Sequence, residues 1–136
     1  MAALIYVDRS EIRYGRADEL EAAAGTLARH VASSEQRALS YGIYFSADRS
    51  TMTVVHVHPD SESLEQLLAH ILPVLAPFRE LLDLRAIDVY GLPSDAVLTR
   101  LRAKVELLGG TITIHGRVAG VDAAVLANPG SSRVEP

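Results

Sequence analysis

The chain has 136 residues, of which 49% are hydrophobic, and its 13 basic and 17 acidic residues give a formal net charge of −4. These values indicate one globular domain, exclude a basic surface for nucleic acid, and, with no cysteine present, exclude disulfides, thiolate metal sites and cysteine nucleophiles. No apolar run approaches the ~20 residues of a membrane span and no signal peptide is recognisable, so we expect a cytoplasmic protein with no membrane partner.

The first predicted elements are a strand and a helix. Residues 4–13 predict a strand with apolar side chains on both faces. From Ala17 onward apolar residues recur at helical spacing, and acidic residues near the start match the positive end of a helix. Ser33 and Ser34 indicate where this helix ends.

A hairpin is predicted next, within residues 39–70, which hold three of the five histidines. Alternating apolar and polar residues predict one strand over 39–45 and, after a polar turn, a second over 51–58. Because side chains two residues apart share a face of a strand, His56 and His58 point to the same side.

A second helix follows the hairpin. Pro59 ends the second strand, and Asp60 or Ser61 can cap the helix that follows. His70 lies on the flank of the apolar stripe of this helix. Two prolines then predict a broken helix over residues 72–82.

The last predicted elements are a strand over 84–92, a helix over 94–108 that two glycines end, and a strand over 111–118. We expect residues 1–122 to form the domain. Residues 123–136 are polar and rich in turn residues, which predicts a flexible C-terminal tail.

The first six elements follow the order β-α-β-β-α-β, which is typical of the ferredoxin-like α+β fold, an antiparallel sheet with helices on one face. The other face would then be bare. Because several strands carry aliphatic residues on both faces, we expect this face to pack on a second copy and form a homodimeric α+β barrel. The strand that starts at Thr111 could pair across that interface.

Three stretches resemble the antibiotic biosynthesis monooxygenase family of dimeric α+β barrels. They are the paired strands Tyr41–Tyr44 and Val54–His58, the helix opening Pro59–Leu64, and the segment Ile87–Pro93. The resemblance covers roughly residues 4–118. It implies a homodimer with a ligand cavity between sheet and helices, and characterised relatives include cofactor-independent oxygenases of phenols or quinols and heme-degrading enzymes.

The chain departs from the residue pattern that this resemblance implies. Active members line the cavity with a helix histidine, often with a tryptophan and an asparagine. Here there is no tryptophan, the only asparagine is Asn128 in the tail, and His58 stands about where a tryptophan often ends the strand. His70 comes about one turn after the usual histidine position, near Leu67. These departures favour the alternative of a non-enzymatic dimeric binding or regulatory module.

For the enzyme reading, a base must ionise a phenolic substrate, because the anion can give an electron to oxygen. Histidine suits this role near neutral pH. We expect His70 and His56 to be catalytic, with His70 the first candidate base, and Tyr41, Tyr44 and His58 to bind a small aromatic substrate. The alternative for His70 is a partly exposed helix residue with no role. No cofactor is expected.

A metal site is the other chemistry that the histidines could support. His56 and His58, with His70 or Asp60 as a third ligand, have a spacing that zinc, iron or copper can use. Histidine pairs on a strand face occur by chance or for packing far more often, so no metal is predicted.

Overall fold

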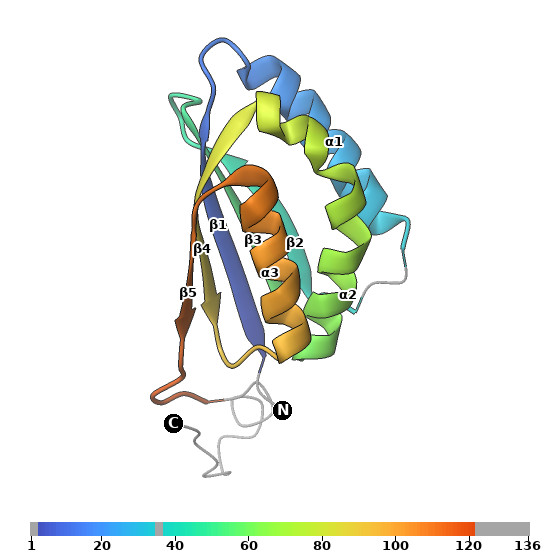
Figure 1. Ribbon diagram of the computed structural model, residues 1–136, viewed down its shortest axis with the longest axis vertical. Coiled ribbons are helices and arrows are strands. Elements are labelled where there is room, and N and C mark those ends of the chain that lie inside the picture. The colour runs from blue at the N-terminus through green and yellow to red at the C-terminus, as the bar shows by residue number, and fades with distance from the viewer. Residues whose placement is uncertain (1–2, 35–36, 122–136) are drawn as a thin grey trace.

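The computed structural model describes residues 3–34 and 37–121, which form a five-stranded sheet with three α-helices on one face (Figure 1). The strand order is β2-β3-β1-β4-β5. The elements are β1 (Leu4–Ile12), α1 (Ala17–Ala32), β2 (Ser40–Phe45), β3 (Thr51–His58), α2 (Ser61–Ile71), β4 (Leu82–Tyr90), α3 (Asp95–Leu108) and β5 (Thr111–His115).

The ferredoxin-like α+β prediction is confirmed for the first four strands, which pair antiparallel in the order expected of a split β-α-β arrangement. β5 adds to the edge of this sheet. It pairs parallel with β4 of its own chain, and α3 supplies the crossover that a parallel neighbour requires. Because β5 is the last strand of the sheet, the hypothesis that the strand from Thr111 also pairs across a subunit interface stays a prediction.

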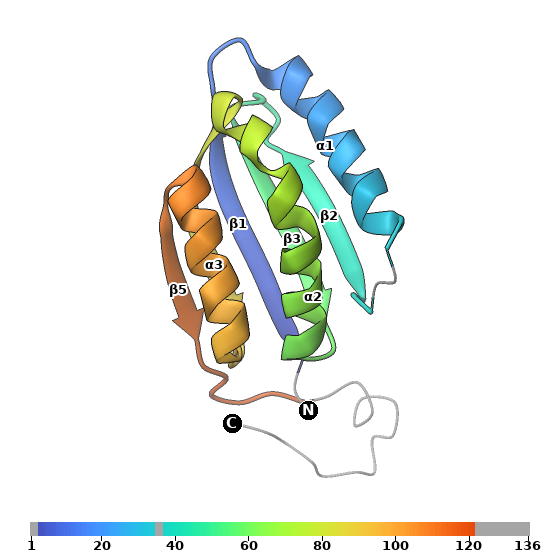
Figure 2. The same ribbon diagram turned by 45° about the vertical axis from the view of Figure 1, so that its right-hand side comes forward.

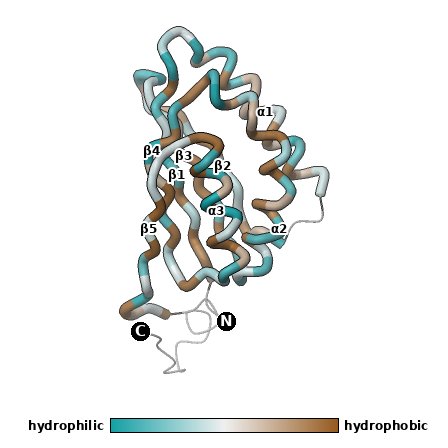
Figure 3. The backbone as a smooth tube through the Cα atoms, in the orientation of Figure 1, coloured by the Kyte–Doolittle hydropathy of each residue, from teal (hydrophilic) through white to brown (hydrophobic). Residues whose placement is uncertain are grey.

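The core lies between the sheet and the helices, which cross it side by side (Figure 2). Buried residues alternate with more accessible ones along β1 and β3, so one face of the sheet supplies most of the core. Hydrophilic residues gather in the loop between β1 and α1 (Figure 3). Among the described residues, no helix is long and apolar enough to cross a membrane.

The ends of the elements follow local chemistry. Asp60 caps α2, because its Oδ1 accepts a hydrogen bond of 2.9 Å from the backbone N–H of Ser63. The broken helix is confirmed as two 3₁₀ turns, Leu72–Val74 and Ala76–Glu80, each with a proline near its start. β4 begins at Leu82, two residues earlier than predicted. The expected tail, residues 123–136, lies outside the described residues.

Candidate functional site

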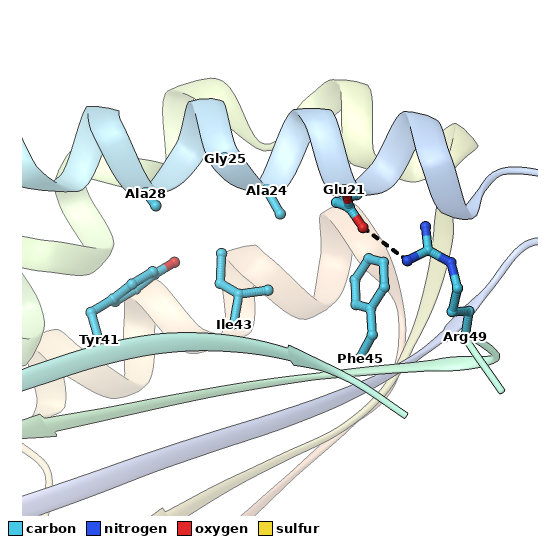
Figure 4. Close-up of a pocket in the computed structure, with 8 residues that line it drawn as sticks. All are labelled: Glu21, Ala24, Gly25, Ala28, Tyr41, Ile43, Phe45 and Arg49. Atoms are coloured by element: carbon cyan, nitrogen blue, oxygen red, sulfur yellow. Dashed lines mark hydrogen bonds and ion pairs between the residues drawn. The ribbon is translucent and has the colours of Figure 1, made fainter. Parts of the chain in front are cut away.

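A cavity of about 410 Å³ lies between α1 and the edge strand β2 (Figure 4). This volume is within the range of small-molecule sites, roughly 300–1,000 Å³. Small side chains on α1 leave the space, and alternate residues of β2 form its floor. Its lining consists of Glu21, Ala24, Gly25 and Ala28 of α1, Tyr41, Ile43 and Phe45 of β2, and Arg49 of the hairpin turn.

The two ends of the cavity differ in polarity (Figure 4). At one end, the Arg49 guanidinium donates hydrogen bonds to Glu21 and Asp18, at 2.8 and 3.0 Å, and lies 5.3 Å from the centre of the Phe45 ring. At the other end stands Tyr41. The walls between them are apolar, so the cavity suits a molecule with an apolar body and a polar group at one end.

Tyr41 connects the cavity to the core of the sheet. It pairs with His56 in the β2–β3 register, and the two rings stack with centres 5.2 Å apart. The Tyr41 hydroxyl has no hydrogen-bonding partner among residues 3–34 and 37–121. Burial, and then the charge of Asp8, raise the pKa of Tyr41 well above its usual value. The hydroxyl therefore stays protonated and can donate a hydrogen bond to a ligand.

His56 is completely buried between two tyrosines. Its ring stacks on Tyr6 at 4.0 Å, on the side of β1, as well as on Tyr41. Its Nδ1 lies 2.7 Å from His58 Nε2, and its Nε2 has no partner in the described part of the chain. Burial, His58 and Lys104 all lower the pKa of His56 well below its usual value, so the ring is neutral at neutral pH.

His58 extends this polar line toward α2. Its Nδ1 lies 2.7 Å from the Ser63 hydroxyl, and both side chains are buried. Burial lowers the pKa of His58 to about 4, against a smaller opposing effect of Asp60. Both histidines are therefore neutral rings joined by a hydrogen bond.

A buried ion pair lies beside the two histidines. The Lys104 ammonium donates to Asp8 Oδ2 at 2.9 Å and to the Tyr6 hydroxyl at 2.7 Å, and Tyr6 donates to Asp8 at 2.6 Å. All three side chains are nearly inaccessible to solvent. Burial, followed by Asp8, raises the pKa of Tyr6 well above its usual value. The three groups satisfy one another, which is what buried charges require.

The structure brings together three of the five predicted site residues: His56, His58 and Tyr41. Tyr44 lies on the opposite face of β2 and is 58% exposed, because residues three apart in a strand point to opposite faces. His70 packs against His30 between α1 and α2, with ring centres 4.0 Å apart, and each Nε2 donates to the other residue's carbonyl oxygen. The catalytic role of His70 and the substrate role of Tyr44 stay predictions.

The metal alternative has no support in the geometry of the described residues, which contain no group of three or more histidine and carboxylate side chains placed to hold an ion. His56 and His58 bind each other through their ring nitrogens. Asp60 is engaged by Arg37, at 2.9 Å, and by the start of α2.

Sequence reasoning missed several polar contacts that join distant segments. Lys104 and Asp8 are 96 residues apart, and His115 donates to Asp88 at 2.8 Å on the outer face of the sheet. A signal for the first pair was present: Lys104 follows Val97 and Leu101 at helical spacing, which places it on the buried face of α3. Ser63 carried no comparable signal.

No family model matches the chain, and no curated protein matches its sequence. Several solved structures have a similar fold. MupZ from Pseudomonas fluorescens is 15% identical with a TM-score of 0.67, and the match covers 92% of this chain and 98% of that one. SnoaB from Streptomyces nogalater, a cofactor-independent oxygenase, is 16% identical with a TM-score of 0.57, covering 69% and 96%.

A third similar structure is a Chloroflexus aurantiacus protein provisionally named an antibiotic biosynthesis monooxygenase. It is 20% identical with a TM-score of 0.53, and the match covers 68% of this chain and 94% of that one. At such identities the likeness shows the fold alone. The chain thus has the α+β, ferredoxin-like fold that the resemblance to monooxygenases implied.

Proposed function

We propose that this protein binds a small aromatic or quinol substrate in the cavity between α1 and β2 and oxidises it with oxygen, without a bound cofactor. The observation that carries the proposal is the stacking of Tyr41, which lines the cavity, on His56, whose buried Nε2 has no partner among the described residues. The fold shared with a cofactor-independent oxygenase supports it.

The proposed reaction begins with a proton transfer from a phenolic O–H to His56 Nε2, which requires the Tyr41 ring to shift, because His56 is buried and does not line the cavity. The phenolate then gives one electron to O₂, and recombination of the two radicals forms a C–O bond. When a CH₂ group conjugated to the phenolate becomes C=O, one oxygen atom enters the product and the other leaves as water. The substrate supplies every electron in this balance, so the reaction needs no redox cofactor.

The polar residues have separate roles in this proposal. Tyr41, kept protonated by its raised pKa, donates a hydrogen bond to the phenolate oxygen. His56 starts neutral because its pKa is lowered, and its unpartnered Nε2 is the atom that takes up the proton in this proposal. We assign the base role to His56 in place of His70, since His70 is engaged with His30 between two helices.

A non-enzymatic binding module is the second candidate. It is favoured by the complete burial of His56, which is not among the residues that line the cavity, and by the lack of tryptophan. In that case the cavity would hold an aromatic ligand and leave it unchanged.

Thermal shift with a panel of phenols and hydroquinones, followed by measurement of oxygen uptake, separates these candidates. A ligand at about 100 times its dissociation constant adds roughly 2.7 kcal/mol to the folded state. The enzyme is supported if the protein takes up oxygen, Tyr41→Phe weakens this uptake and His56→Gln abolishes it. The control variant, His70→Ala, should keep the oxygen uptake of the wild type. Binding without oxygen uptake indicates the binding module, and no binding at all would overturn both.

We also propose that the protein is a homodimer formed through the outer face of the sheet. Ile5, Tyr44 and Tyr90 on this face are 40, 58 and 43% exposed, and the paired residues Val7 and Val55 lie between them. An apolar sheet face of this kind needs a cover. The cytoplasmic location expected from the sequence stays a prediction.

Sedimentation tests the dimer. A charge in the middle of the face, introduced by Val55→Lys, should give monomers, whereas Ala103→Lys on the exposed side of α3 should leave the dimer intact. A wild-type mass of one chain at micromolar concentration would contradict the proposal.

A further inference from the structure

Three buried side chains form a continuous line of hydrogen-bonding atoms from the sheet to the start of α2. Ser63 Oγ lies 2.7 Å from His58 Nδ1, and His58 Nε2 lies 2.7 Å from His56 Nδ1. His56 Nε2 is the free end of the line in the described part of the chain. Each of the three residues is at most 1% exposed.

Local structure explains how these residues meet. His56 and His58 are two residues apart in β3, so both point to the helix-covered face. Asp60, which caps α2, accepts from the Ser63 N–H and so fixes the first turn of the helix above His58. The line is therefore built by the strand, the cap and the helix start together.

The hydrogen bonds couple the proton positions of the two rings. If His56 carries its proton on Nδ1, it donates to His58 Nε2, and His58 must then carry its own proton on Nδ1 and donate to Ser63. In the opposite arrangement Ser63 donates to His58 Nδ1, His58 donates from Nε2, and His56 carries its proton on Nε2. Either way both rings have the same tautomer.

We propose that His56, His58 and Ser63 are a proton relay that accepts a proton at His56 Nε2 and releases one at the Ser63 hydroxyl. The incoming proton binds Nε2, the Nδ1 proton of His56 passes to His58 Nε2, and the Nδ1 proton of His58 passes to the Ser63 oxygen. Ser63 gives its own hydroxyl proton to the neighbouring Asp60 carboxylate, which already accepts from the Ser63 N–H. One proton enters and one leaves, which converts the first tautomeric arrangement into the second. The part of this proposal in which the relay acts as the base of the oxidation rests on the proposed function.

The surrounding charges explain why a relay is needed. A proton held on His56 would form a buried cation near the Lys104 ammonium, and burial already lowers the pKa of His56. The Asp8 carboxylate is occupied by Lys104 and Tyr6. At the other end, Asp60 is the carboxylate next to the release point, and it favours a positive charge near His58. Passing the proton on leaves both rings neutral.

The relay predicts a result that does not depend on activity. In the free protein, ¹⁵N NMR of the imidazole rings should report the same tautomer for His56 and His58. Ser63→Ala, which leaves His58 Nδ1 without its partner, should alter the ring signals of both histidines together, and Ser63→Thr should restore them. Ser10→Ala is the control: Ser10 is also a buried serine, but it lies in β1, and its replacement should leave both rings unchanged.

Opposite tautomers, or a response confined to His58, would overturn the relay whatever the activity. If a phenol is turned over, Ser63→Ala should lower kcat about tenfold or more with little change in KM, since proton transfer by a positioned side chain contributes roughly 10²-fold or more. An unchanged kcat would overturn the relay and leave the oxygenase proposal standing. Coupled rings without turnover of any phenol would support the relay and overturn the oxygenase proposal.

Discussion

The buried pair of Lys104 and Asp8 allows the sharpest test of the structure. The side chains are 7 and 3% exposed, and Lys104→Met removes the ammonium that lies 2.9 Å from the Asp8 carboxylate. Only the Tyr6 hydroxyl would still donate to this carboxylate. Breaking a buried pair from one side costs about 3–5 kcal/mol, because the remaining charge is not compensated. A domain of this size has a stability of roughly 5–15 kcal/mol, so the loss is large but measurable.

A second variant separates the charge from the packing. Lys104→Met/Asp8→Asn keeps an oxygen that can accept from Tyr6 but removes the uncompensated charge. We expect it to recover at least about half of the lost stability, because what remains is a buried amide instead of a buried carboxylate.

Urea unfolding at neutral pH measures all three proteins. Lys104 is the only lysine of the chain, so lysine-specific acylation with mass spectrometry provides an independent assay. The side chain should react slowly in the folded wild type and at a normal rate in urea. A cost below about 1 kcal/mol for Lys104→Met with an unchanged m-value, or rapid acylation of the native protein, would show that the pair is not buried as described.

Three further predictions concern other polar contacts. The folded-state pKa of His58 is about 4, and that of His56 is also lowered, so below pH 6.5 the unfolded chain binds more protons than the folded protein. The free energy of unfolding should therefore be highest above pH 6.5. On acidification it should fall by about 1.4 kcal/mol per pH unit for each of the two histidines. Urea midpoints between pH 7 and 5 check this, and a flat profile contradicts it. Asp60→Ala should cost about 1 kcal/mol by removing the cap of α2, whereas Asp60→Asn should cost only a few tenths; equal losses would argue against the cap. His70→Ala should cost about 1 kcal/mol in thermal unfolding by removing the contacts with His30, without weakening ligand binding at the cavity; lost binding would return the base role to His70.

The local patterns of the sequence were sufficient to predict the elements and most of their ends. Alternation in residues 51–58 correctly placed His56 and His58 on one face, and the proline followed by an acidic residue correctly placed the start of α2. These features depend on neighbours within a few residues, so the sequence contains the information directly. The order of elements then fixed the ferredoxin-like arrangement.

The site was less predictable because it depends on contacts between distant segments. The stack of His30 on His70 joins residues 40 apart, and the spacing of either histidine gave no indication of it. The burial of Asp8 could have been predicted from the sequence, since Asp8 follows Leu4 and Tyr6 at every second residue of the strand and so shares their face. A charged residue in a buried phase predicts a buried partner, but the sequence does not say that the partner is Lys104.

The cavity between α1 and β2 has a consequence for how this protein could diversify. Gly25 lies in the middle of α1, where glycine is about 1 kcal/mol less favourable than alanine, and a Cβ at this position would make only an ordinary contact of 3.5 Å with the Arg29 side chain. Glycine at this position therefore makes the helix less stable although the packing would admit alanine, and it leaves empty space in the cavity. Larger side chains at Gly25 or Ala28 would reshape that space and leave His56 and His58 in place. Under the proposed function, the ligand preference of the cavity would then change independently of the proton transfer that we propose for the two histidines.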